Sequence, residues 1–153
     1  MLTSRRGALL ALGAGLLLPC AAAARPRQPT ISWSISLPRR PDRDQLEKVL
    51  RKSLEREARK AHWGKEFQDD VEAHIDVHEL RSMVDGEMAH VSCAAIGKVK
   101  GLGVARSRFS YGGKAAQRHK LEQHVLELVA RGIVVRLAEI AREKHDGWKV
   151  VRA

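Results

Sequence analysis

The chain has 153 residues, of which 44% are hydrophobic and only 4% aromatic, and 28 lysines and arginines outnumber 18 aspartates and glutamates. This length forms one domain, and the scarcity of aromatic residues requires a core of aliphatic side chains. The formal net charge of +10 favours polyanions over cationic partners, and the alternative is that the basic side chains only keep the surface solvated.

The first 24 residues contain the three parts of an export signal in the expected order. Arg5 and Arg6 form a positively charged n-region, and residues 8–18 form an uncharged, apolar h-region. Ala22–Ala24 provides the small residues of a signal-peptidase cleavage site. A membrane-spanning helix needs roughly 20 apolar residues, so this run is too short. We expect residues 1–24 to be a signal peptide, the protein to be periplasmic or extracellular, and no transmembrane segment to remain after cleavage. A retained N-terminal helix is the alternative.

Two details refine this prediction. Ser4, Arg5 and Arg6, followed by an apolar stretch, resemble a twin-arginine signal, although its usual Phe is absent and Sec export stays open. The segment Leu17–Cys20 resembles a bacterial lipobox. However, Pro19 stands where Gly, Ala or Ser normally precedes the lipidated cysteine. Anchoring through a lipid on Cys20 is therefore the less favoured alternative.

Signal cleavage changes the charge and the cysteine count. Arg5 and Arg6 leave without any acid, so the net charge falls from +10 to +8, and Cys20 leaves with them. Cys93 is then alone and cannot form an intrachain disulfide, and its place on an apolar strand face predicts a buried thiol. Outside the inner membrane, the available polyanions are lipid headgroups, lipopolysaccharide and wall polymers, which disfavours nucleic acid as a partner.

The mature chain begins with a basic, proline-containing leader, residues 25–29, and residues 30–153 are expected to form one domain. Polar and apolar residues alternate strictly over residues 30–37, which places Ile31, Trp33, Ile35 and Leu37 on one face. This period of two predicts a half-buried strand.

An amphipathic helix is expected next. Asp44 and Glu47 have the spacing of a capping box, with Asp44 as the N-cap. Apolar residues then recur at spacings of three and four as far as Ala61, and His62–Gly64 is a plausible helix stop.

The period returns to two at Val71, and here a three-stranded meander is predicted. Leu80 and Val84 are out of phase with the preceding apolar residues, so a β-bulge is expected near His78 and Glu79 to return them to the inner face. Asp85 and Gly86 form a hairpin signal, and the next strand extends over residues 87–100.

A second hairpin is expected at Gly101–Gly103, followed by a strand over residues 104–111 that Gly112 and Gly113 interrupt. The expected register places Lys98 opposite Arg106 and Ile96 opposite Arg108, which gathers cations on one face. The remaining expected pairs are Lys100 with Val104, Cys93 with Tyr111, and Ala95 with Phe109.

A wide apolar stripe over residues 114–144 predicts a long helix, with a kink or break at Gly132. Asp146 and Gly147 are expected to end it, and residues 148–151 to form a short strand. The order of strand, helix, three-stranded meander and long helix predicts an α+β fold, a two-layer sandwich with a mainly antiparallel sheet.

The basic side chains of the second hairpin are the candidate binding site. Lys98, Lys100, Arg106 and Arg108 repel one another, and a bound anion would relieve that repulsion. Compensation within the protein, by Asp76 or Glu72, is the alternative. Binding would be to an envelope protein or to an anionic lipid or polysaccharide.

Metal binding is a second hypothesis. His74, Asp76 and His78 alternate along one strand, and residues two apart on a strand share a face about 6.8 Å apart. With help from His90, such donors suit zinc or copper. The structural alternative is a solvated polar face.

No feature of the chain points to catalysis. The sequence lacks a Gly-x-Ser-x-Gly elbow, and Gly101 and Gly103 lack the spacing of a nucleotide-binding loop. An exported hydrolase of unknown type is a third alternative. In element order, the mature chain is loosely similar to small periplasmic accessory lipoproteins that activate wall synthases or assist outer-membrane secretion. This resemblance implies a non-catalytic cell-envelope protein.

Overall fold

The computed structural model describes residues 28–64, 67 and 70–151. The expected signal peptide at residues 1–24 lies outside the described residues, as does most of the leader. Within the described part of the chain, no helix is both long and apolar enough to cross a membrane.

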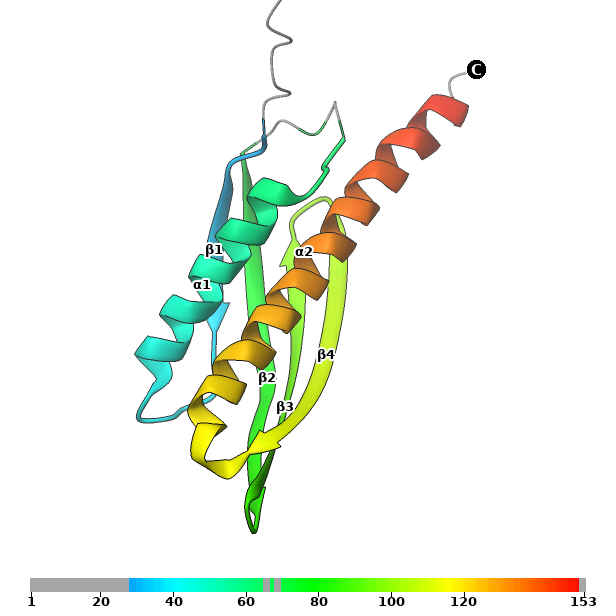
Figure 1. Cartoon of the computed structure of the whole chain (residues 1–153). Helices are drawn as coiled ribbons and strands as arrows, with labels where there is room; N and C mark the ends of the chain where they lie inside the picture. Colours follow the sequence, from blue (N-terminus) through cyan, green and yellow to red (C-terminus); the bar gives the residue numbers. More distant parts are fainter. Residues whose placement is uncertain (1–27, 65–66, 68–69, 152–153) are drawn as a thin grey trace, which may run out of the picture.

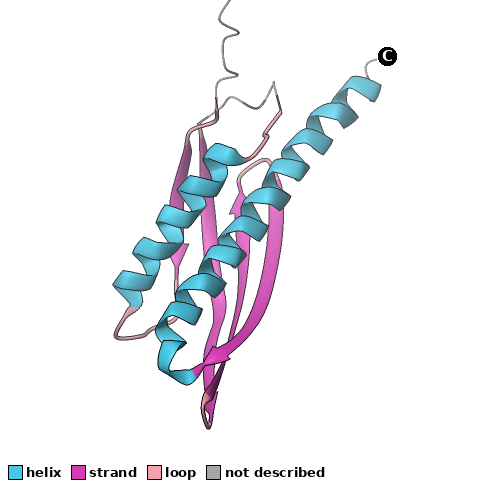
Figure 2. Ribbon diagram, viewed as in Figure 1, coloured by secondary structure: helices cyan, strands magenta, loops and turns pink. Residues whose placement is uncertain are grey.

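Four strands and two helices form a two-layer α+β sandwich, which confirms the predicted fold class (Figures 1 and 2). In chain order, the elements are β1 (Ile31–Ser36), α1 (Arg43–Lys60), β2 (Val71–Asp85), β3 (Met88–Val99), β4 (Gly103–Lys114), the short 3-10 helix η1 (Ala115–Gln117) and α2 (Arg118–Val151). The sheet order is β1-β2-β3-β4. β1 is parallel to β2, with α1 as the connection, and the other pairs are antiparallel.

The core lies between the sheet and the helices, which cover the same face of the sheet (Figure 1). Because alternate strand residues point to opposite faces, the alternating apolar residues of β3 all lie inside, namely Ala89, Val91, Cys93, Ala95 and Val99. The largest fully buried side chains include Leu46, Leu50 and Leu54 of α1, Ile75, Val77 and Val91 of the sheet, and Leu126, Ile133 and Leu137 of α2.

The predicted β-bulge in β2 is confirmed, since the register with β3 shifts between Val77 and Glu79. The shift returns Leu80 to the inner face, where it is 9% exposed. Val84 also returns to this face, opposite Ala89, but it is 52% exposed. Val84 lies near the tip of the β2–β3 hairpin, and this tip extends beyond the helical layer (Figure 1).

The predicted β3–β4 register is wrong by two residues. Val99 pairs with Gly103, so that Lys98 lies opposite Val104, Ile96 opposite Arg106 and Cys93 opposite Phe109. The loop therefore consists of Lys100, Gly101 and Leu102 rather than residues 101–103. A shift of two residues leaves every side chain on its predicted face, because strand side chains alternate with a period of two.

Three predictions about the end of the chain are also wrong. β4 continues through Gly112 and Gly113, α2 passes Gly132 without a break, and residues 148–151 belong to α2. Gly132 is explained by packing: a Cβ at this position would lie 2.4 Å from Ser107 Oγ of β4. The glycine therefore allows close approach of the helix to the sheet.

The N-terminus of α1 also differs from the prediction. The helix begins at Arg43, and Asp42 rather than Asp44 is its N-cap, without a side-chain capping hydrogen bond. The backbone carbonyl of Asp42 accepts hydrogen bonds from the N–H groups of Gln45 and Leu46, both at 3.1 Å. The Asp42 carboxylate instead accepts from the Arg40 guanidinium.

Cys93 is a buried free thiol, as predicted, with no exposed surface. Burial, together with the charge of Glu79, raises its pKa to about 12. Because the thiolate is the reactive form, this cysteine is inert at neutral pH in the folded protein.

Candidate anion-binding face

The two helices leave the opposite face of the sheet uncovered, and charged side chains occupy this outer face. In the described part of the chain, its exposed cations are Arg81, Lys98, Arg106, Arg108 and Lys114, with Lys100 in the adjoining loop. Its acids are Glu72, Asp76, Glu79 and Asp85. We call Lys98, Lys100, Arg106 and Arg108 the basic face.

The observed register arranges the basic face diagonally. Lys98 pairs with Val104 and Arg106 pairs with Ile96, so these two cations are diagonal neighbours rather than direct cross-strand partners. Diagonal neighbours on one face remain within reach of long side chains. All four side chains of the basic face are exposed, and the structure brings them to the same half of the sheet.

Arg108 is neutralised by Glu79. Its guanidinium lies 3.4 Å from Glu79 Oε2, and Ser92 Oγ donates to Glu79 Oε1 at 3.2 Å. The acid that compensates Arg108 is therefore Glu79, whereas the alternative considered from the sequence was compensation by Asp76 or Glu72. The β-bulge explains this, because it brings Glu79 opposite Ala94, which is itself opposite Arg108. Among the described residues, the three other cations of the basic face form no ion pair.

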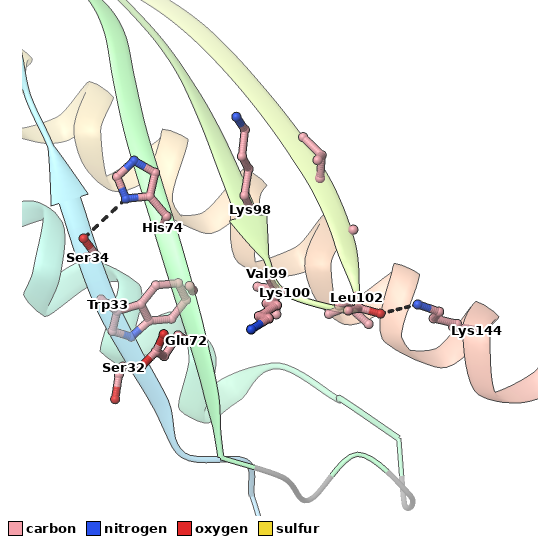
Figure 3. A pocket seen from close by; sticks show the side chains of 14 residues that line it. Ser32, Trp33, Ser34, Glu72, His74, Lys98, Val99, Lys100, Leu102 and Lys144 are labelled. Carbon is pink, nitrogen blue, oxygen red and sulfur yellow. Dashed lines mark hydrogen bonds between the residues drawn. The ribbon is translucent and has the colours of Figure 1, made fainter.

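A hollow of about 920 Å³ lies beside the β3–β4 hairpin (Figure 3). Its cations are Lys98 and Lys100 of the basic face and Lys144 of α2. Lys144 Nζ donates a hydrogen bond to the Gly101 carbonyl. The polar wall on β1 and β2 is formed by Ser32, Ser34, Glu72 and His74, and the remaining lining residues are Trp33, Ala73, Val99, Gly101, Leu102, Gly103 and Val104.

The parallel pairing of β1 with β2 positions the polar wall of this hollow. Ser34 lies opposite His74, and His74 Nδ1 is 3.3 Å from Ser34 Oγ. On the other side, His74 lies opposite Lys98 of β3. Ser34, His74 and Lys98 therefore form a row across three strands, with Lys144 approaching the hairpin from α2 (Figure 3).

The two arginines of the basic face line a second, smaller depression of about 420 Å³. It is lined by His78, Glu79, Ala94, Ala95, Ile96, Arg106, Ser107 and Arg108. The basic face is thus divided between two depressions, and Arg108 in the smaller one already has an anionic partner.

The predicted metal donors are not gathered. His74 and Asp76 lie on the outer face, opposite Lys98 and Ile96, and His78 lies at the bulge. His90 lies opposite Met83, which places it about 27 Å along the sheet from His74. Among the described residues, the group whose donor atoms lie within 4.8 Å of one another is instead Asp42, His119 and Glu122.

The hypothesis that the strand histidines bind a metal has a direct test. Because two neighbouring donors make a poor zinc site, we expect purified protein equilibrated with zinc and then dialysed to retain less than one equivalent. Elemental analysis measures this, with a His74→Ala His78→Ala variant as the control. One zinc per chain that is lost in the variant would contradict our expectation and establish the site.

Asp42 and Glu122 of this group both accept hydrogen bonds from the Arg40 guanidinium, so a cation of the protein already lies between these carboxylates. Glu122 is 1% exposed and accepts from Arg40 Nη2 at 3.1 and 3.2 Å, while His119 Nδ1 lies 3.6 Å from Glu122 Oε2. Although burial lowers the pKa of Arg40, the hydrogen bonds and charges of Glu122 and Asp42 outweigh it and raise the pKa overall. The cluster links the segment before α1 to the start of α2, and no local pattern could reveal it, because Arg40 and Glu122 are 82 residues apart.

No family model matches the chain, and no curated protein matches its sequence. Among solved structures, it is similar to a candidate lipoprotein from Caulobacter crescentus CB15, with 13% identity and a TM-score of 0.48 over 73% of this chain and 88% of that one. A minor lipoprotein from Acinetobacter baumannii has 11% identity and a TM-score of 0.35 over 76% and 94%. PelC from Paraburkholderia phytofirmans, a dodecamer, has 11% identity and a TM-score of 0.41 over 72% and 88%.

Proposed function

We propose that this chain is an exported, non-catalytic cell-envelope protein that binds an anionic envelope surface through the basic face. The observation that carries the proposal is the uncovered outer face of the sheet. Three of the four cations of the basic face lie there or in the adjoining loop without an ion pair among the described residues.

Electrostatics supports an anionic partner for this face. Cations gathered on one exposed face without ion pairs produce a positive potential that attracts an anionic surface. Basic side chains near an anionic membrane contribute roughly 1 kcal/mol each. The export-signal pattern of residues 1–24 is the reason for proposing an envelope surface rather than nucleic acid.

The proposal is tested by vesicle co-sedimentation of the purified protein. We expect binding to vesicles that contain phosphatidylglycerol but not to pure phosphatidylcholine, and loss of binding at 1 M salt, where the Debye length is about 3 Å. Replacing Lys98, Lys100, Arg106 and Arg108 by Gln should weaken binding by about tenfold or more.

A matched control separates the basic face from net charge. Lys48, Lys52, Lys120 and Arg131 are exposed on the helices, and their replacement by Gln removes the same four charges. This control should bind like the wild type. Equal weakening of both variants, or no weakening of either, would refute binding through the basic face.

A further inference from the structure

The cations of the basic face differ in whether an acidic side chain of the protein already pairs with them. Glu79 neutralises Arg108 in the smaller depression. In the larger hollow, Lys98 and Lys100 are joined by Lys144, which comes from α2 and was not among the predicted site residues. Three lysines from two layers of the fold therefore line the hollow, and Lys144 Nζ also donates to the Gly101 carbonyl.

We propose that this hollow is a phosphate site that holds the phosphate group of an envelope ligand, an inference that rests on the proposed function. Lysine ammonium groups are compact charges with three donors each, which suits a phosphate oxygen approached from several directions. Around the same space, Ser32 and Ser34 add hydroxyl groups. His74 uses Nδ1 toward Ser34, which leaves its Nε2 for a ligand.

The charge of the hollow favours an anion even when its acid is included. Glu72 is the acid among the described lining residues, and it is exposed and forms no ion pair with another described residue. Three lysines against one glutamate leave two uncompensated positive charges, and a phosphate monoester carries nearly the same number of negative charges at pH 7.

The size of the hollow fits more than a bare ion. Small-molecule sites occupy about 300–1,000 Å³, and this hollow of about 920 Å³ lies in that range. A phosphorylated glycerol or sugar would fill it better than inorganic phosphate does. The same phosphate ester occurs in soluble metabolites and in lipid headgroups, so the experiment must separate these two sources.

The first arm uses glycerol 3-phosphate, titrated into purified protein and followed by NMR. We expect shifts at the amides of Gly101 and Gly103 and at the His74 ring. The triple variant Lys98→Gln Lys100→Gln Lys144→Gln should bind about tenfold more weakly, whereas Lys48→Gln Lys52→Gln Lys120→Gln should bind normally. Malonate, a dicarboxylate, should bind more weakly than the phosphate ester. Equal binding of malonate, or an unaffected triple variant, would overturn the proposal.

The second arm uses vesicles and identifies the source of the phosphate. If phosphatidylglycerol vesicles lose binding in the triple variant, the phosphate site takes a lipid headgroup. If only glycerol 3-phosphate binding is lost, the site takes a soluble phosphate ester.

The same arm distinguishes failure of the phosphate site from failure of the proposed function. If the triple variant keeps wild-type binding to both ligands while the four-residue variant of the basic face loses vesicle binding, the phosphate site is wrong and the proposed function stands. If the four-residue variant also binds vesicles normally, the proposed function is wrong as well.

Discussion

Replacing Arg40 by leucine is expected to lower the free energy of unfolding by about 3 kcal/mol. Glu122 is 1% exposed, and the Arg40 guanidinium is its counter-charge at 3.1 Å. Removing one partner of a buried ion pair leaves the other charge uncompensated, which typically costs about 3–5 kcal/mol. The lower end applies here because the Arg40 side chain is 23% exposed and His119 lies 3.6 Å from the same carboxylate. Urea denaturation followed by circular dichroism measures the change.

A double variant tests the mechanism of this loss. In Arg40→Leu Glu122→Leu no buried charge is left without a partner, so most of the stability should return. The exposed pair of Arg136 and Glu139 provides the comparison, and Arg136→Leu should change little, because exposed ion pairs contribute little. If the double variant is as unstable as Arg40→Leu alone, the burial of an unpaired charge is not the cause.

Replacing Gly97 by alanine should also destabilise the fold, by about 2 kcal/mol, the usual cost of overpacking a core. Gly97 is buried in the middle of β3, and a Cβ there would lie 2.6 Å from Ile133 Cγ2 and 3.1 Å from Ile75 Cδ1. Ile133 is β-branched and stiff on its helix, so it cannot move aside without strain. On an unpacked strand, the same substitution would increase stability, because glycine weakens strands.

A double-mutant cycle with Ile133→Ala isolates this contact. The two substitutions together should cost less than the sum of their separate effects, since the alanine at 133 makes room for the new Cβ. The comparison is Gly112→Ala on the outer face of β4, where the added Cβ would meet the movable ring of His90. Additive effects of the first pair, or a Gly97→Ala protein as stable as the wild type, would show that α2 does not pack as closely on β3 as described.

The alternation of apolar residues was sufficient to predict the strands and their buried faces. Ala89, Val91, Cys93, Ala95 and Val99 are all 5% exposed or less, since a sheet with one covered face must bury alternate residues. The same alternation could not detect the shift in the β3–β4 register. A shift of two residues moves no side chain to the other face, so the alternation cannot distinguish the two registers. In the structure, Gly101, with φ of +77°, is the middle residue of the three-residue loop.

Several glycines misled the prediction because they have packing rather than breaking roles. Gly113 lies beneath Leu121, whose Cδ2 would be 2.9 Å from an added Cβ, and Gly132 faces Ser107. Local propensity treats glycine as an interruption, whereas close approach between layers is a property of the folded molecule. The same reasoning applies to the candidate site, because the sequence could not predict that Lys144 and Glu79 belong to it. Helix α2 brings Lys144 to the β3–β4 hairpin, and the β-bulge brings Glu79 to Arg108.

The connection between β1 and β2 is much longer than the two hairpin loops of the meander. β2, β3 and β4 join through loops of two and three residues, whereas β1 reaches β2 only after α1 has been placed between them. Closing a long connection costs more chain entropy than closing a tight hairpin, so the meander can form before β1 adds to its edge. Strand β1 carries Ser32 and Ser34, one wall of the hollow. The hollow is therefore complete only when β1 is docked, and a local opening at the β1 edge would remove that wall.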